Sequence, residues 1–381
     1  MSDAPAPGRA RRLVGFGPAG RINRLLADPR VQSLAARTPV LRRLARRDGE
    51  AIFDIVAGFC ASQALMALVD LRIPERLMDG ALTVEQLAAR CDMPEAGLRV
   101  LLRANVATGL LKLRRGDRVA LTRRGAAMAG VPGLREMILH HKVLYRDLAD
   151  PVAVFRGEAK TELARFWPYV FGAAEAGDAA LAARYSELMA QSQRLVAEDT
   201  LAAVDLRHAR VLLDIGGGTG TFLCAACRAA PRLRGILFDL PQVAEGARTR
   251  IEEAGLAGRI GIAAGSFHTD PLPSGADTIS LVRVAYDHED STVAAILQRV
   301  HAILPDAGRL ILSEPMTGGA VPTVPGDVYF ALYTLAMRTG KARSASEIAA
   351  LCKAAGFDRV DTPKMPRPFV TSVVIAEKLS E

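Results

Sequence analysis

The feature that most constrains the fold is a glycine-rich run that closes a short apolar segment in the second half of the chain. Residues 211–215 form the apolar segment, and Asp214-Ile215-Gly216-Gly217-Gly218-Thr219-Gly220 leads from it into a helical pattern. Glycine permits a tight turn and lets a ligand lie directly against the backbone. A strand, a glycine loop and a helix in this order are typical of an α/β domain that binds a nucleotide-like cofactor.

The spacing of these glycines argues against a nicotinamide dinucleotide site. The pattern G-x-G-x-x-G would need its third glycine at Thr221 if it began at Gly216, or at Leu223 if it began at Gly218. The pattern found here, D-x-G-x-G-x-G, suits a cofactor that lacks a pyrophosphate.

Two later segments supply further candidate contacts to a cofactor. Asp239 ends the second strand, 25 residues after Asp214, about where an acidic residue accepts hydrogen bonds from both ribose hydroxyls. Gly265-Ser266-Phe267 follows the third strand, where an adenine ring would stack or hydrogen-bond. The alternatives are a solvated aspartate and an ordinary turn, and the glycine loop favours the cofactor interpretation.

Alternating strands and helices predict a doubly wound parallel sheet for the C-terminal half. The expected strands are 211–215, 235–238, 259–263, 278–284 and 309–313, with an antiparallel edge strand at 370–376 and helices at 291–304 and 345–355.

The preceding part of the chain predicts helices and a winged-helix pattern. Thr83 and Gln86 form a candidate capping box, a second helix spans 95–110, and a hairpin spans 112–121. Residues 133–204 are expected to be helical, with a break at 172–177. We therefore expect a basic arm over 1–49, a helical winged-helix domain over 50–204 and a cofactor-binding domain over 205–381.

Positive charge is concentrated in the N-terminal arm. Residues 1–50 hold eleven Arg and four acidic side chains, so they carry +7 of the net charge of +8. A short helix is expected over 39–47. Residues 55–69 are apolar, but they are fewer than the about 20 residues that span a membrane, so we expect a buried helix at a subunit interface. The arm itself can meet a membrane surface, pack on a partner subunit or remain solvated.

The cysteines argue against disulfides and against a metal site. The chain has five cysteines at irregular spacing, which fits a reducing, cytoplasmic compartment. Cys224 and Cys227 form a C-x-x-C pair without a second pair, so we expect no metal.

The motifs occur in the order found in a known family. The runs at 214–220, 238–241, 265–267, 270–273 and 283–290 resemble the small-molecule O-methyltransferases of the plant caffeate and hydroxyneurosporene type. The resemblance covers residues 50–378. It implies a Rossmann-like, class I methyltransferase domain behind a winged-helix dimerisation domain. It also implies a homodimer that uses S-adenosylmethionine and binds no nucleic acid.

Within that family, the chain is most similar to the carotenoid 1-O-methyltransferases of purple bacteria. The similarity lies in the arginine-rich arm, in the run Phe53-Asp54-Ile55-Val56-Ala57-Gly58-Phe59 that follows it, and in the triplet Tyr286-Asp287-His288. It implies a lipophilic acceptor, the 1-hydroxyl of a hydroxylated carotenoid, met in the cytoplasm or peripherally at the inner membrane.

The resemblance also implies the site residues. Those expected to bind the cofactor are Asp214, Gly216, Gly218, Gly220, Asp239, Leu240, Ser266, Phe267 and Arg283. Those expected to be catalytic are Tyr286, His288 and Glu314. Tyr286 stands where the plant-type enzymes have a histidine base, and His288, where they have tryptophan, has the better ordinary pKa for a base. Whether Tyr286 or His288 is the base stays open, and Glu314 can polarise either one.

Other positions depart from the family pattern. A second glutamate expected within 340–343 is missing and Ala342 stands there, and Ser266 replaces an aspartate expected at adenine.

An apolar acceptor would need an apolar pocket. Candidate lining residues are Met316, Tyr329, Phe330, Tyr333, Met337, Trp167, Phe171 and Met189. Three other functions remain as alternatives: a bacteriochlorophyll-pathway C-methyltransferase or another small-molecule O-methyltransferase of this fold, a winged-helix DNA-binding regulator, and a scaffold without a base. The regulator is disfavoured because only Arg99 and Arg103 give its second helix polar reach.

Overall fold

The computed structural model describes residues 18–166 and 192–379. The chain divides into two compact units, Met1–Gly125 and Ala126–Glu381. The division comes earlier than the expected boundary after residue 204. The reason is that α8 (Leu134–Asp147) and α10 (Glu162–Phe166) pack against α15 (Ala331–Met337) of the second unit.

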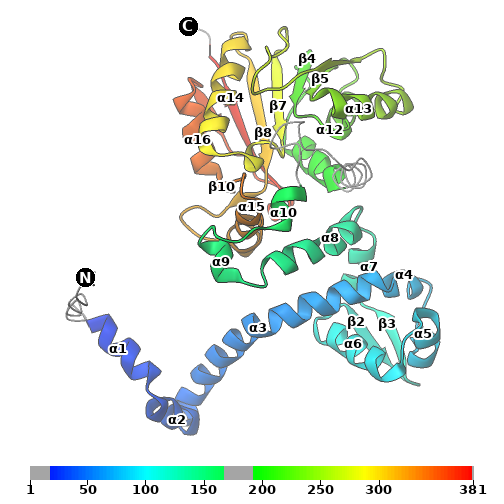
Figure 1. The fold of residues 1–381 in the computed structure, drawn as a ribbon, viewed down its shortest axis with the longest axis vertical. Coiled ribbons are helices and arrows are strands. Elements are labelled where there is room, and N and C mark those ends of the chain that lie inside the picture. The colour runs from blue at the N-terminus through cyan, green and yellow to red at the C-terminus, as the bar shows by residue number, and fades with distance from the viewer. Residues whose placement is uncertain (1–17, 167–191, 380–381) are drawn as a thin grey trace, which may run out of the picture. The chain divides into compact units, whose positions relative to one another are not determined.

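The first unit contains the expected winged-helix pattern (Figure 1). Its elements are α1 (Pro18–Ala27), α2 (Pro29–Arg37), α3 (Pro39–Asp70), α4 (Ile73–Arg76), β1 (Leu82–Thr83), α5 (Val84–Cys91), α6 (Glu95–Ala107), β2 (Leu111–Arg114) and β3 (Arg118–Leu121). The capping box is confirmed, because the Gln86 N–H donates to Thr83 Oγ1 and the Thr83 N–H donates to Gln86 Oε1. The side chain of Arg99 on α6 is engaged by Glu95 and Asp117.

Helix α3 corrects one sequence-based expectation and leaves a second one untested. The short helix expected at 39–47 and the apolar helix expected after it are one continuous helix of 32 residues. Within the single chain only Met66, Leu68 and Val69 near its end are buried, whereas Ile55 is 80% and Phe59 66% exposed, so burial at a subunit interface stays a prediction. By length and composition alone α3 could cross a membrane, a property that it shares with many core helices.

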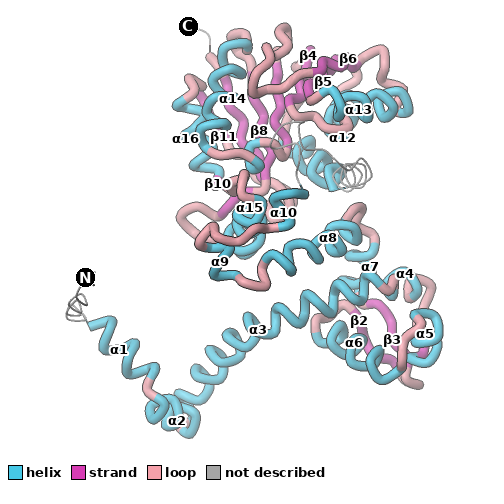
Figure 2. The backbone as a smooth tube through the Cα atoms, in the orientation of Figure 1, coloured by secondary structure: helices cyan, strands magenta, loops and turns pink. Residues whose placement is uncertain are grey.

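The second unit is built on a seven-stranded sheet with the order β11-β12-β8-β7-β4-β5-β6 (Figure 2). The strands are β4 (Val211–Ile215), β5 (Arg234–Asp239), β6 (Ile260–Ala264), β7 (Thr278–Val282), β8 (Arg309–Glu314), β11 (Arg359–Asp361) and β12 (Ser372–Glu377). β4 to β8 are parallel, and β12 runs antiparallel to β8, as expected. The short strand β11 was missed.

Helices cover both faces of this sheet. The remaining elements are α7 (Arg123–Ala129), α9 (Pro151–Phe155), α12 (Thr221–Ala229), α13 (Pro241–Glu253), η3 (Ala285–Asp287), α14 (Asp290–Ile303), β9 (Met316–Thr317), η4 (Val324–Phe330), β10 (Arg343–Ser344) and α16 (Ala345–Ala354). One apolar cluster joins the sheet to α14 and α16, and another joins it to α12, α13 and helical residues 192–203. The expected helical break at 172–177 lies outside the described residues.

The strand order predicts a ligand crevice at the carboxyl ends of β4 and β7. Strands β4, β5 and β6 follow one another in one direction, whereas the chain returns to the other side of β4 to form β7 and β8. Ligands of open α/β sheets bind at such a reversal of strand order.

Candidate active site

The glycine loop presents bare backbone at this crevice. Gly216, Gly218 and Gly220 have φ angles of +68°, +58° and +77°, which L side chains rarely adopt. A Cβ on Gly216 would lie 2.7 Å from Val284 Cγ2, so the loop packs closely against the chain after β7. A Cβ on Gly218 would meet nothing within 4 Å. The loop therefore offers an open surface that a side chain would obstruct.

Asp239 links this loop to the end of β5. The Gly218 N–H donates to Asp239 Oδ2 and the Leu240 N–H donates to Asp239 Oδ1, both at 2.7 Å. Burial raises the pKa of Asp239, and the two backbone hydrogen bonds oppose that rise. Each carboxylate oxygen has a further lone pair, so the side chain can also accept hydrogen bonds from a ribose.

Asp214 supports the loop from the interior of the unit. Its side chain is buried and accepts a hydrogen bond of 2.6 Å from Ser280 Oγ. A Cβ on Gly217 would lie 2.8 Å from Asp214 Oδ2, so the loop runs directly over the carboxyl group. Burial raises the pKa of Asp214 to about 7.

Aromatic side chains gather after β6, where an adenine ring is expected. The ring of Phe267 lies 4.5 Å from that of His268 and 5.3 Å from that of His288, measured between centroids. The Ser266 N–H donates to Asp270 Oδ2. Burial lowers the pKa of His288 to about 4, helped by His268 and Arg343, so its imidazole is neutral at pH 7.

The backbone at the start of the turn η3, which begins the Tyr-Asp-His triplet, is hydrogen-bonded to the side chain of Glu314. Glu314 is buried, and its Oε1 accepts hydrogen bonds from the N–H groups of Val284 at 3.0 Å and Ala285 at 2.8 Å. Burial raises the pKa of Glu314 to about 8. The expected polarising partners, the Tyr286 hydroxyl and the His288 ring, are not among its side-chain hydrogen bonds in the described part of the chain.

Arg343 binds the backbone carbonyls of the same turn, and the sequence interpretation missed this residue. Its Nη1 donates to the Ala285 carbonyl and its Nη2 to the His288 carbonyl, both at 2.8 Å. Its Nε donates to Asp290 at 2.7 Å. The guanidinium is almost wholly buried. A buried cation therefore stands at the end of the segment 340–343, next to Ala342, where a glutamate was expected.

Arg283 contacts Tyr286 and Ser192 in the described part of the chain. Its φ of +58° is unusual for a residue with a side chain, and such strain is common at functional sites. Its guanidinium lies 5.9 Å from the centre of the Tyr286 ring, and Nη2 lies 3.4 Å from the Tyr286 hydroxyl. Nη1 donates to Ser192. Burial raises the pKa of Tyr286, so its phenol is neutral at pH 7.

Two histidines that no motif indicated lie in the same unit. Nε2 of His140 is 2.9 Å from the Tyr333 hydroxyl, and Nε2 of His141 is 2.6 Å from the Tyr329 hydroxyl. Of the other candidate lining residues, Met316 and Met337 are buried and Phe330 packs on Tyr329. Trp167, Phe171 and Met189 lie outside the described residues.

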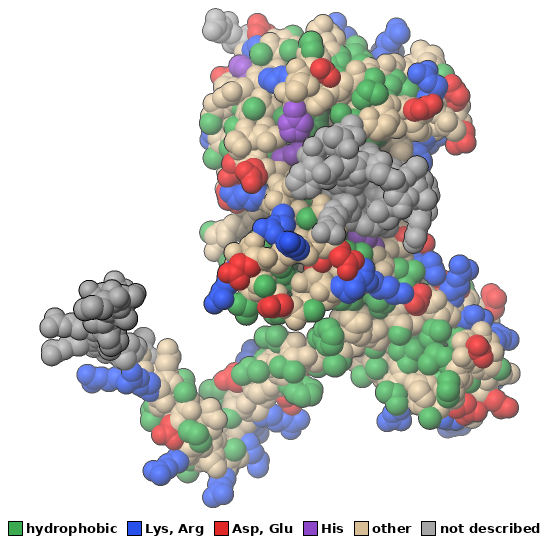
Figure 3. Space-filling model, viewed as in Figure 1, with side chains coloured by type: hydrophobic (Ala, Val, Ile, Leu, Met, Phe, Trp, Pro, Cys, Tyr) green, Lys and Arg blue, Asp and Glu red, His purple; other side chains and the backbone are tan. Residues whose placement is uncertain are grey.

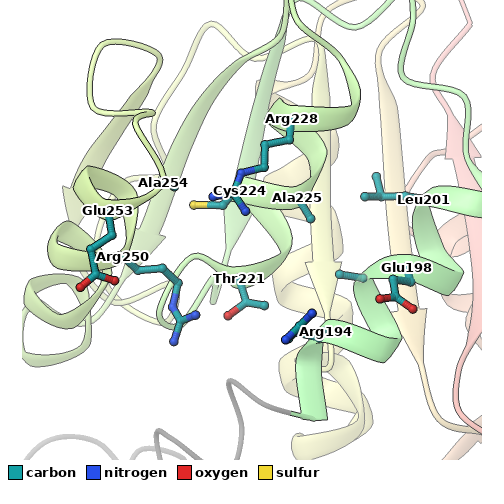
Figure 4. Close-up of a pocket in the computed structure, with 11 residues that line it drawn as sticks. Arg194, Glu198, Leu201, Thr221, Cys224, Ala225, Arg228, Arg250, Glu253 and Ala254 are labelled. Carbon is teal, nitrogen blue, oxygen red and sulfur yellow. The ribbon is translucent and has the colours of Figure 1, made fainter. Parts of the chain in front are cut away.

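A separate cavity of about 440 Å³ lies between α12, α13 and helical residues 192–203 (Figure 4). Arg194, Arg228 and Arg250 line it together with Glu198 and Glu253. Its lining includes Thr221, which follows the glycine loop, but neither the loop glycines nor Asp239, so the glycine loop is the better cofactor site.

No cluster of His, Cys, Asp and Glu that could hold a metal occurs among residues 18–166 and 192–379. Cys224 and Cys227 are buried in an apolar cluster, and burial raises the pKa of Cys227 to about 11.

Two family models match the chain. An O-methyltransferase domain matches residues 145–358, and an O-methyltransferase dimerisation domain matches residues 53–129. Together they span the winged-helix region and the crevice described above.

Two bacterial proteins are similar over most of their length. The demethylspheroidene O-methyltransferase of Cereibacter sphaeroides is 53% identical over 358 residues, covering 94% of each chain. The enzyme of the same name from Rhodobacter capsulatus is 50% identical, covering 94% of this chain and 90% of its own.

Solved structures have the same fold. CalO1, a methyltransferase in calicheamicin biosynthesis in its SAH-bound form, has a TM-score of 0.74 at 26% identity, covering 88% of this chain and 98% of its own. Human N-acetylserotonin methyltransferase in complex with SAM has a TM-score of 0.72 at 22% identity, covering 87% and 98%.

Proposed function

Since the chain belongs to the O-methyltransferase family, we propose that it transfers a methyl group from S-adenosylmethionine to the 1-hydroxyl group of a hydroxylated carotenoid. The observation that carries the acceptor is the identity of 50–53% with two demethylspheroidene O-methyltransferases, which extends over 94% of this chain. The direct test is product analysis with labelled cofactor and a 1-hydroxycarotenoid.

The residues at the crevice fit this cofactor. Gly218 leaves open space where a Cβ would stand, and Asp239 faces it with an acceptor for ribose hydroxyls. Phe267 and His288 present rings at the end of the crevice assigned to adenine. When bound, the cofactor supplies an electrophilic methyl group on a sulfonium. The protein contributes alignment, which lowers the entropic part of the barrier.

The turn η3 positions the groups that meet the acceptor. Glu314 and Arg343 fix its backbone, so we assign both to positioning. Tyr286 orients the acceptor hydroxyl, with Arg283 holding the phenol in place. His288 was the other candidate base, but its ring contact with Phe267 favours a place beside adenine instead.

A second copy of the chain is the proposed partner of α3. The dimerisation model begins at residue 53, and the apolar side chains that follow are exposed in the single chain. They are Phe53, Ile55, Val56 and Phe59, each at least 66% exposed. An apolar face of this kind is typical of an interface between identical subunits.

Helices α1 and α2 are proposed to contact a membrane surface, where a carotenoid would be found. α1 and α2 expose Ile22, Leu25, Leu26 and Leu34, each at least 56%. Arginines interleave with these apolar side chains, and Figure 3 shows both kinds on this part of the chain. Amphipathic, arginine-rich helices bind anionic membranes. We therefore place the enzyme in the cytoplasm, in reversible contact with the inner membrane.

A further inference from the structure

Two histidine–tyrosine pairs connect α8 to the segment formed by η4 and α15. His140 and Tyr333 are both buried, at 9% and 6% exposure. Their polar atoms are 2.9 Å apart, and the rings are 6.1 Å apart. His141 and Tyr329 form the second pair, with rings 5.4 Å apart in an edge-to-face arrangement. The first pair is therefore the more enclosed of the two.

Helix α15, which carries Tyr333, lies close to the turn that carries Tyr286, because a Cβ on Gly340 would meet both the Tyr286 carbonyl oxygen and Thr334 of α15. Burial raises the pKa of Tyr333 well above its ordinary value, and the neighbouring hydroxyls of Tyr286 and Tyr329 raise it further. Arg283, which contacts Tyr286, acts on the same Tyr333 hydroxyl in the opposite direction. Tyr333 therefore lies between two groups: its electrostatic surroundings include Tyr286 and Arg283, and its hydroxyl is hydrogen-bonded to His140.

We propose that the Tyr333 hydroxyl accepts the proton of the acceptor hydroxyl and passes its own proton to Nε2 of His140. This inference rests on the function proposed above. As the bond from the acceptor oxygen to the methyl carbon forms, the bond from that carbon to sulfur breaks and its electron pair stays on sulfur. The acceptor oxygen loses its proton to Tyr333, Tyr333 remains a neutral phenol, and His140 becomes an imidazolium.

Proton loss from the acceptor hydroxyl during methyl transfer needs only a weak base, such as the buried imidazole of His140. A tertiary alcohol holds its proton tightly, but the proton becomes strongly acidic as the oxygen gains a third bond. Burial and the neighbouring His141 lower the pKa of His140 to about 4, so its imidazole is neutral and able to accept a proton at pH 7. Tyr286, which occupies the family's base position, is a neutral phenol whose hydroxyl is hydrogen-bonded by Arg283, and no histidine bonds it among residues 18–166 and 192–379.

The competing explanation is that His140 only fills and ties the core. His140→Gln separates the two roles, because an amide keeps a hydrogen bond to Tyr333 but does not take up a proton. His141→Gln is the matched control on the neighbouring residue, which also pairs with a tyrosine. His140→Ala tests rescue, because free imidazole can enter the space left and restore a proton acceptor but cannot restore a core contact elsewhere.

The experiment measures kcat, acceptor KM and cofactor Kd for each variant of the full chain. In His140→Gln and Tyr333→Phe we expect kcat to fall about 100-fold, within the usual range for losing general base catalysis, with cofactor Kd unchanged. In His141→Gln we expect kcat within about threefold of the original chain. Imidazole should raise kcat of His140→Ala in proportion to its concentration.

Three results would overturn the inference: a kcat of His140→Gln within about threefold of the original chain, equal losses in the His140 and His141 variants, or no rescue by imidazole. The original chain is the internal reference. If it yields no methylated carotenoid, the proposed function fails, and the inference fails with it.

Discussion

Asp239 accepts a hydrogen bond of 2.7 Å from the backbone N–H of Gly218. The end of β5 and the loop after β4 therefore form one hydrogen-bonded unit. Because the Gly218 N–H is already bound to this carboxylate, a ribose would meet an acceptor whose position is fixed before the cofactor binds. Such preorganisation reduces the entropic cost of binding.

Replacement of Asp239 by alanine tests the ribose contact. Loss of a charged hydrogen-bond acceptor is expected to weaken S-adenosylmethionine binding by roughly 1.5–3 kcal/mol, about 10- to 150-fold in Kd. Calorimetry measures it, with Glu245→Ala on α13 as the control because Glu245 is an exposed carboxylate on the helix that follows. Equal cofactor affinity in the Asp239 variant and the control would show that the ribose lies elsewhere.

Gly218→Val tests whether the cofactor lies against the loop. The variant places a side chain in the open space and also has a φ of +58°, which costs an L residue about 1–2 kcal/mol. Gly255→Val is the matched control, because Gly255 has a φ of +68° and its Cβ would also meet nothing within 4 Å. We expect similar losses of melting temperature in both variants, and loss of cofactor binding in Gly218→Val alone. Intact binding in Gly218→Val would remove the loop from the cofactor site.

Glu314→Gln tests how η3 is held. The amide oxygen can still accept hydrogen bonds from Val284 and Ala285, but the side chain no longer ionises. Burial raises the pKa of Glu314 from 4.5 to about 8 in the folded chain. The stability that it contributes is therefore present below about pH 4.5 and is lost as the pH rises through about 8.

The free energy of unfolding, measured in urea at about pH 5 and about pH 9, should shift in favour of the glutamine variant as the pH rises. Taking the difference between variant and original chain cancels Asp214, whose pKa burial also raises to about 7, whereas Asp287 helps to raise the pKa of Glu314 and so contributes to the difference. A difference that does not change with pH would mean that Glu314 ionises freely in the folded state.

Local patterns predicted the parts of the fold that depend on neighbouring residues. The glycine loop has positive φ angles that favour glycine, so its glycines reveal it in the sequence. The capping box of Thr83 and Gln86 involves only four consecutive residues, so it could be predicted as well. The continuity of α3 could not, because Gly49 and Asp48 look like a break although helix geometry tolerates both.

Contacts between distant segments were beyond sequence reasoning. His140 and Tyr333 are 193 positions apart and meet only because α8 packs against α15. Arg343 was missed for a related reason. It binds the carbonyls of Ala285 and His288, which are more than 50 positions away, and the family pattern indicated only a glutamate in this segment.

Removal of the N-terminal helices tests the membrane contact. A deletion of residues 1–37 ends before α3 begins at Pro39, so it leaves that helix whole. We expect it to reduce co-sedimentation with anionic vesicles, because each arginine that reaches such a surface contributes about 1 kcal/mol. Replacement of Arg21, Arg24, Arg30 and Arg37 by glutamine should do the same without shortening the chain. Equal binding of the full chain to anionic and neutral vesicles, unaffected by salt, would contradict the proposal.

The most direct test of the central claim is the transfer of a labelled methyl group to a defined carotenoid. The full chain is incubated with methyl-labelled S-adenosylmethionine and vesicles that contain a 1-hydroxycarotenoid, and the pigments are separated and analysed by mass spectrometry. We predict one labelled methyl group on the 1-oxygen, with no product from the matching carotenoid that lacks the hydroxyl or from the Gly218→Val variant. A label on carbon, or none on the hydroxylated carotenoid while the protein binds the cofactor, would contradict the account.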